Sequence, residues 1–325
     1  MTNGMRIRHR VGLSVACGSW GVFIAYFGMN AVPEQLAKDF SWPWRAARAL
    51  LEGLDPYQVI LATGPYPYNV GLLYPLPAGL LAIPFAPFPP ALAGALFVGI
   101  SATLLAWALT KESPHRLALF TSAPFCMAAL LGQWSPILTA AALLPALQFV
   151  CAAKPNIGLV SLVYRPSWKG AAGAIALAIV ALFFVPQWPM EWLEALKAAP
   201  RYRGPAFSLI GAFTLLGLLR WRRKEGRLFV AMALVPQLTL FYDQLPLWLV
   251  PSTIWRTLTL TVLSWVAWFQ WYPSRGLPSS VAMAKPWILA LIYLPALAML
   301  LWLPEREEPD TPTTEPDKRG NSGDR

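Results

Sequence analysis

The residues best suited to chemistry lie in one charged stretch, residues 38–57 (KDFSWPWRAARALLEGLDPY), directly after the first apolar run. Charged side chains beside a bilayer are costly to maintain, so they are by default candidates for a functional site. A carboxylate held at such a surface can remove a proton from an alcohol. The stretch contains three carboxylates and two arginines: Asp39, Glu52, Asp55, Arg45 and Arg48.

Asp39 is the first candidate for a general base, but its position also suits a structural role. The apolar spacing predicts a helix from Ser41 to Gly53, with Ser41 as N-cap, Pro43 in the first turn and Gly53 just beyond the end. A carboxylate before such a helix stabilises its N-terminus, and spacing alone favours this role for Asp39. Asp55, followed by Pro56, is predicted to form an Asx-type turn.

Two further charges lie inside apolar stretches, Lys154 and Asp243. A charge at membrane depth indicates a functional residue that needs a partner. The alternative for Asp243 is an interfacial residue at a helix end, and the alternative for Lys154 is a side chain that snorkels to the interface.

A lipid phosphate would require cations at the interface, and arginine can grip it with two hydrogen bonds. The candidates for phosphate binding are Lys154, Arg201 and Arg203. The candidates for an acceptor or polar site are Asp243, Tyr242, Arg45 and Gln133.

Composition indicates an all-α, polytopic membrane protein. Of the 325 residues, 56% are hydrophobic and only 13% are charged, and the mean hydropathy is +0.48. A soluble domain carries roughly 25% charged residues. The 16 Trp suit membrane interfaces. The net charge of +10 comes from short basic clusters between apolar runs, which favours the positive-inside pattern over nucleic-acid binding. Neither a metal site nor another cofactor is expected.

The apolar runs predict about nine to eleven transmembrane helices within one domain, residues 1–303. The first run is followed by an outer loop, about 30–70, that contains the surface helix, and a second surface helix is predicted at about 187–200. Residues 304–325 are predicted to be a disordered acidic tail. The arginines of the N-terminus place it in the cytoplasm, so the first loop is predicted to be extracytoplasmic.

Several of these motifs together resemble glycosyltransferase family 87, whose members are membrane mannosyltransferases with the GT-C architecture. The resemblance is most specific in the first loop, at Asp39-Phe40 and residues 46–57 (AARALLEGLDPY). Weaker similarities are Tyr74-Pro75-Leu76-Pro77 with Pro84, Gly132-Gln133, Lys154-Pro155 and Phe241-Tyr242-Asp243 through Pro251. The resemblance covers most of residues 39–251.

The resemblance implies transfer of a sugar, mannose or another hexose or pentose, from a polyprenyl-phosphate donor with inversion. It implies Asp39 as general base and a glycolipid or glycan as acceptor. It also implies a GT-C-like fold in a bacterial-type plasma membrane, among membrane lipids and without a nucleic-acid partner. The chain is short for this family, and Asp243 lies in a segment where family members often carry a histidine. The alternative function is therefore a catalytically inactive subunit of a larger membrane complex.

Overall fold

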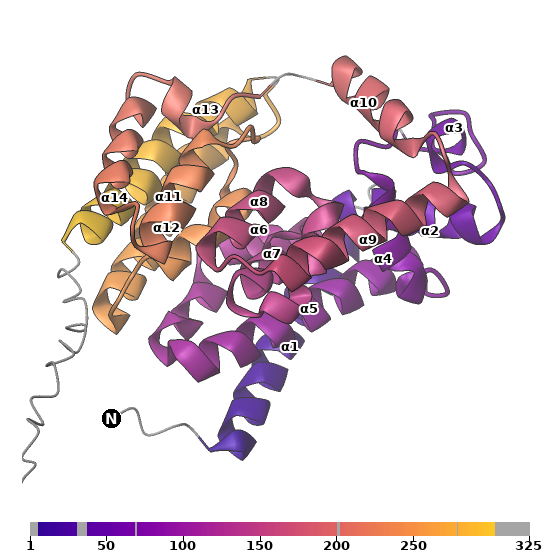
Figure 1. The fold of residues 1–325 in the computed structure, drawn as a ribbon. Coiled ribbons are helices and arrows are strands. Elements are labelled where there is room, and N and C mark those ends of the chain that lie inside the picture. The colour runs from indigo at the N-terminus through magenta and orange to yellow at the C-terminus, as the bar shows by residue number, and fades with distance from the viewer. Residues whose placement is uncertain (1–5, 31–37, 69, 200–201, 278, 303–325) are drawn as a thin grey trace, which may run out of the picture.

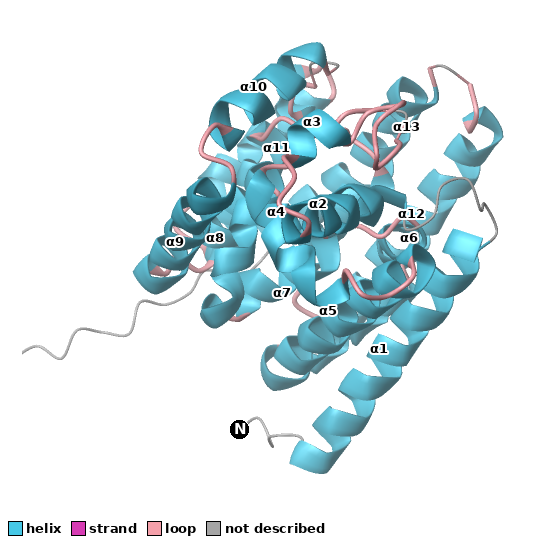
Figure 2. Ribbon diagram, turned by 90° about the vertical axis from the view of Figure 1, so that its right-hand side faces the viewer, coloured by secondary structure: helices cyan, strands magenta, loops and turns pink. Residues whose placement is uncertain are grey.

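The computed structural model describes residues 6–30, 38–68, 70–199, 202–277 and 279–302, and these residues form helices without any strand (Figure 2). The α-helices are α1 Ile7–Asn30, α2 Ser41–Leu51, α3 Pro56–Val59, α4 Leu76–Ala82, α5 Pro90–Glu112, α6 Ala123–Leu130, α7 Ser135–Leu143, α8 Pro155–Tyr164, α9 Trp168–Phe184, α10 Trp188–Ala198, α11 Lys224–Leu234, α12 Ile254–Trp271, α13 Ser280–Ile288 and α14 Leu294–Leu301. The 3-10 helices are η2 Lys38–Phe40, η3 Ile83–Phe85, η4 Pro114–Thr121, η5 Pro145–Ala153, η6 Pro205–Phe207, η7 Gly211–Arg220, η8 Phe241–Leu249 and η9 Tyr272–Ser274, and a π-helical turn, η10 Leu289–Tyr293, joins α13 to α14.

Three helices of the described chain are long and apolar enough to cross a membrane: α1, α5 and the continuous segment Ser280–Leu301. A fourth span results if α9 and α10 are counted as one broken helix, bent by 99°. Large apolar side chains are exposed along α1, α9, η7 and α12, where hydrocarbon would cover them. These features indicate an integral membrane protein.

Many of the apolar runs fold as short helices. The run 136–153 divides into α7 and η5, and Pro155–Tyr164 is a helix of ten residues, as expected for a half-helix. A helix of ten residues is about 15 Å long, half the thickness of the hydrocarbon core. The expected nine to eleven spans therefore stay a prediction, because a pair of short helices can replace one crossing.

The two long helices α1 and α5 form the base of the molecule (Figure 1). Their close approach requires small residues, because a Cβ on Gly18 would clash with Thr103 and a Cβ on Gly99 would clash with Val22. Such small-residue contacts are typical of helix packing in membranes. The C-terminal helices α11, α12 and α14 lie to one side of the central helices, and α2, α3 and α10 lie to the other (Figure 1).

Helix α2 confirms the predicted helix of the first loop but corrects its start. Ser41 is the first helical residue, and the cap position belongs to Phe40, which makes no side-chain capping bond. Gly53 has φ of +71° directly after the helix, as predicted, and its N–H donates to Leu50 O. This left-handed ending suits glycine because a Cβ would be strained there. The Asx turn at Asp55 is also confirmed, since its carboxylate accepts a bond from Tyr57 N at 2.9 Å.

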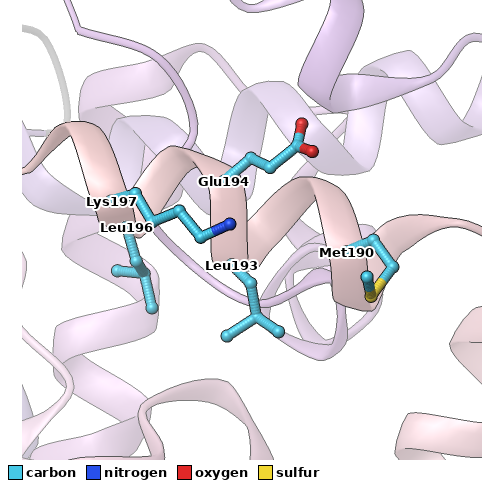
Figure 3. A pocket seen from close by; sticks show the side chains of 5 residues that line it. All are labelled: Met190, Leu193, Glu194, Leu196 and Lys197. Atoms are coloured by element: carbon cyan, nitrogen blue, oxygen red, sulfur yellow. The ribbon is translucent and has the colours of Figure 1, made fainter.

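Helix α10 confirms the second predicted amphipathic helix. Its Trp192 donates from Nε1 to Leu73 O at 3.0 Å, which fixes it to the segment before α4. Figure 3 shows Leu193 and Leu196 on one side of α10 and Glu194 on the other. The predicted disordered tail, 304–325, lies outside the described residues.

Candidate functional site

The carboxylate of Asp39 accepts a hydrogen bond from Nε2 of Gln133, although 94 positions separate the two residues in the chain. Asp39 lies in the short η2 turn, and its backbone N–H donates to Leu131 O at 3.1 Å. Asp39 is half-buried and Gln133 is fully buried. The carboxylate is thus directed toward the turn between α6 and α7 rather than used as the cap of α2.

That turn is a Schellman motif built on Gly132. Gly132 has φ of +61°, its N–H donates to Ala129 O at 3.3 Å, and the N–H of Gln133 donates to Ala128 O at 2.9 Å. This pair of bonds ends α6 and places Gln133 between two helices in a fixed direction.

Lys154 extends the chain of hydrogen bonds from the other side of Gln133. Its Nζ donates to Gln133 Oε1 at 3.2 Å and forms an ion pair with Asp243 Oδ1 at 2.7 Å. Pro155 at the start of α8 disfavours a helical backbone at Lys154, whose φ of −145° and ψ of 80° lie outside the helical region. The Gln133 amide orientation follows from its partners, because a carboxylate requires its N–H and an ammonium requires its oxygen.

Asp243 is only 2% exposed, within a segment whose residues are all buried. The ammonium of Lys154 supplies the counter-charge that this buried carboxylate requires. The neighbouring Tyr242 presents its ring to Lys154, whose Nζ is 5.4 Å from the ring centroid. Lys154 therefore has a carboxylate partner, as expected of a charge inside an apolar stretch.

A second polar network holds η8, the segment that carries Asp243. Gln244 donates to Gln237 Oε1 at 2.9 Å and accepts from Tyr293 Oη at 2.7 Å. At the far end of η8, Arg116 Nε donates to Pro251 O at 3.0 Å. Both ends of η8 are fixed by buried hydrogen bonds, so the position of Asp243 is well defined.

Aromatic rings and unused donors surround Asp39 and Gln133. Trp134 packs against Phe40 and Tyr74 with centroid distances of 6.3 and 6.4 Å. Trp134 Nε1, Ser135 Oγ and Arg45 Nη1 are buried and have no hydrogen-bond partner among the described residues. Donors in such a setting can bind the oxygen atoms of a sugar or a phosphate.

Arg45 lies at the edge of this region. Its guanidinium is 4.7 Å from the ring centroid of Tyr68, and burial lowers its pKa. Burial also raises the pKa of Tyr68, with a further contribution from the charge of Asp39. Arg45 is therefore linked to the site through Tyr68, which lies close to both Arg45 and Asp39.

The structure does not bring every candidate together. Asp39, Gln133, Lys154 and Asp243 form one hydrogen-bonded chain, which we call the polar chain, with Tyr242 beside it. Arg203 is exposed, and Arg201 lies outside the described residues. Among the residues that the structure describes, no three His, Cys, Asp or Glu side chains are grouped to hold a metal ion.

Sequence reasoning missed the support network of Gln237, Gln244 and Tyr293. The available signal was the pair of glutamines in the otherwise apolar run around Asp243, because buried amides require partners. Tyr293 gave no such signal, since a tyrosine in the last apolar run is typical of a membrane interface.

No family model matches this chain, and comparisons with curated proteins and with solved structures find no match either.

Proposed function

We propose that the chain is an integral-membrane glycosyltransferase of GT-C-like architecture, related to family 87, that transfers a sugar from a polyprenyl-phosphate donor to an extracytoplasmic acceptor. The observation that carries the proposal is the polar chain, which joins four segments of the protein through Asp39, Gln133, Lys154 and Asp243. The proposed orientation has a cytoplasmic N-terminus in a bacterial-type plasma membrane.

In the proposed reaction, a hydroxyl of a glycolipid or glycan attacks the anomeric carbon of the donor sugar. Its proton passes to the Asp39 carboxylate, and the electron pair of the breaking bond leaves with the lipid phosphate. Attack opposite the phosphate inverts the anomeric carbon. The hydrogen bond from Gln133 favours the ionised form of Asp39, which is the form that accepts a proton.

Lys154 supplies a positive charge next to Gln133, the residue that binds the Asp39 carboxylate. An ammonium has three N–H donors, and the bonds to Gln133 and Asp243 use two of them. The third can bind an oxygen of the sugar phosphate, where the charge develops as the bond breaks. Arg45, with its unpaired Nη1, is the second cation that we assign to this role in place of the exposed Arg203.

A second candidate function, a non-catalytic subunit of a membrane complex, is favoured by a different observation. Lys154 and Asp243 neutralise each other in a buried position, as a structural clamp between α8 and η8 would. In that case the four residues serve stability alone.

The two functions are separated by replacing Asp39. The assay measures release of polyprenyl phosphate from polyprenyl-phosphate-mannose in membranes that contain the protein. Asp39→Asn is expected to reduce transfer by about 10²- to 10⁴-fold, the usual contribution of a general base, with normal expression. The matched control is Asp55→Asn, the same chemical change in the same loop, which keeps an N-cap and is expected to retain activity. Full activity of Asp39→Asn would overturn the proposed mechanism.

A further inference from the structure

A long apolar groove lies between α9 and η5, away from the polar chain. Its cavity volume is about 590 Å³. The walls are formed by Phe149 of η5 and by Gly173, Ala176 and Val180 of α9, and Ser167 and Lys169 lie at one end. The groove is therefore apolar along its length and cationic at a single end.

Small residues of α9 create the groove. Gly173 has no side chain, and a Cβ added to it would lie 3.1 Å from Phe149 Cβ, so the helix and η5 nearly touch at that point. Ala176, one turn further, leaves open space. Ile175, Ile179 and Val180 are 61%, 50% and 44% exposed, so the surface around the groove is apolar and faces outward. Such a surface on a membrane protein contacts lipid chains.

The cationic end has the character of a membrane interface. Trp168 is 76% exposed, and the Lys169 ammonium lies 5.8 Å from the centroid of its ring. Tryptophan and lysine are the residues that anchor helices at the headgroup level. Lys169 is exposed and has no carboxylate partner among the residues that the structure describes.

The length of the groove matches one leaflet of a bilayer. Lys169 and Val180 are eleven positions apart on one helix, which corresponds to about 16 Å. The hydrocarbon core is about 30 Å thick, so this is about half of it. A single acyl chain that begins at the headgroup near Lys169 would end near Val180.

We propose that the groove between α9 and η5 binds one acyl chain of an anionic phospholipid, with the lipid phosphate at Lys169. The site is distinct from the polar chain. None of the residues that line the groove belongs to the polar chain. The proposal does not depend on the proposed transferase activity.

The test measures lipid binding to the purified full-length protein by native mass spectrometry, with phosphatidylglycerol and phosphatidylcholine as probes. Lys169→Gln is expected to weaken binding of phosphatidylglycerol about five-fold, the effect of one lysine near an anionic headgroup, and to leave phosphatidylcholine nearly unchanged. Its control is Lys111→Gln, which removes an exposed lysine at the end of α5.

A second pair of variants tests the groove itself. Ala176→Trp fills the groove and is expected to reduce binding of both lipids, while Ile175→Trp, at an exposed position of α9 outside the groove, leaves binding unchanged. Unchanged phosphatidylglycerol binding in Lys169→Gln would overturn the assignment of the lipid phosphate to Lys169. This variant alters only an exposed side chain and is expected to fold. It therefore tests the proposal even if Ala176→Trp fails to fold. Unchanged lipid binding in a folded Ala176→Trp variant would overturn the assignment of the acyl chain to the groove.

Discussion

The two ends of α8 each carry an ion pair, and the pairs are opposites in almost every respect. Lys154 caps the N-terminus and pairs with Asp243, with side chains 14% and 3% exposed. Arg165 follows the C-terminus and pairs with Glu112, with side chains 39% and 22% exposed. The distances, 2.7 and 2.6 Å, are nearly equal, so geometry alone does not distinguish the pairs.

The helix dipole distinguishes them. A cation is stabilised at the C-terminus of a helix and destabilised at the N-terminus, so Arg165 is favourably placed and Lys154 is not. Desolvation adds to the cost at Lys154, and the bonds to Gln133 and Asp243, with the ring of Tyr242, offset it. The comparison shows that a lysine at position 154 is unfavourable for the stability of α8 itself. Unfavourable positions of this kind are common among functional residues.

The largest expected effect on stability follows from Lys154→Met. This change leaves Asp243 buried without its counter-charge, which costs about 3–5 kcal/mol. The free energy of unfolding, measured by denaturant titration in mixed micelles, is expected to fall by that amount. A loss below about 1 kcal/mol would mean that the ion pairs at the two ends of α8 contribute similar stability.

Gln133→Leu is expected to have the next largest effect. It removes the bonds to Asp39 and Lys154 together, and so takes one hydrogen bond from a half-buried carboxylate and one from a largely buried ammonium, at a cost of about 1–3 kcal/mol. The same titration measures it. The isosteric change Gln133→Glu introduces a second negative charge opposite Asp39 and is expected to lower the free energy of unfolding by more than Gln133→Leu does. Equal stability of the two variants would argue against the bond to Asp39.

The double variant Lys154→Met with Asp243→Leu sharpens the comparison, because it removes both charges. Buried pairs replaced by apolar residues are often neutral or stabilising, so most of the stability lost in Lys154→Met is expected to return. Sugar transfer from polyprenyl-phosphate-mannose is expected to stay absent. Recovery of transfer together with stability would show that the pair is structural only.

The smallest effect is expected from Glu112→Gln at the other end of α8. Exposed pairs contribute about 0–1 kcal/mol, and Arg165 keeps its bond to Leu143 O at 3.0 Å. Unfolding titrations at low and high salt are expected to show this small difference only at low salt, since salt screens exposed charges. A loss of unfolding free energy as large as that of Lys154→Met would show that the exposed pair contributes as much stability as the buried pair.

The members of the polar chain could be chosen from sequence, but their connections could not. Lys154 and Asp243 stood out because each charge interrupts an apolar run. Asp39 was favoured by spacing as the start of α2, yet its carboxylate bonds to Gln133. Which of several polar groups meet is decided by tertiary packing across 94 positions of chain, and periodicity carries no information about that.

The fold shows a similar division. The helices α2 and α10 were predictable because glycine and apolar spacing are local signals, although the cap of α2 was predicted one residue too late. The division of the run 136–153 into α7 and η5 was not, because both halves are equally apolar. Hydropathy shows that a segment is apolar enough to lie in the hydrocarbon core. It does not show whether the segment crosses as one helix or as two short ones.

The π-helical turn η10 places Tyr293 where its hydroxyl reaches Gln244. A turn of this kind contains one residue more than an α-helical turn. Deleting that residue would rotate one part of the last helix by about 100° against the other and carry the hydroxyl off the glutamine. The helical phase at η10 therefore influences a segment some fifty positions earlier, so a residue inserted or deleted within η10 would disturb the segment that carries Asp243.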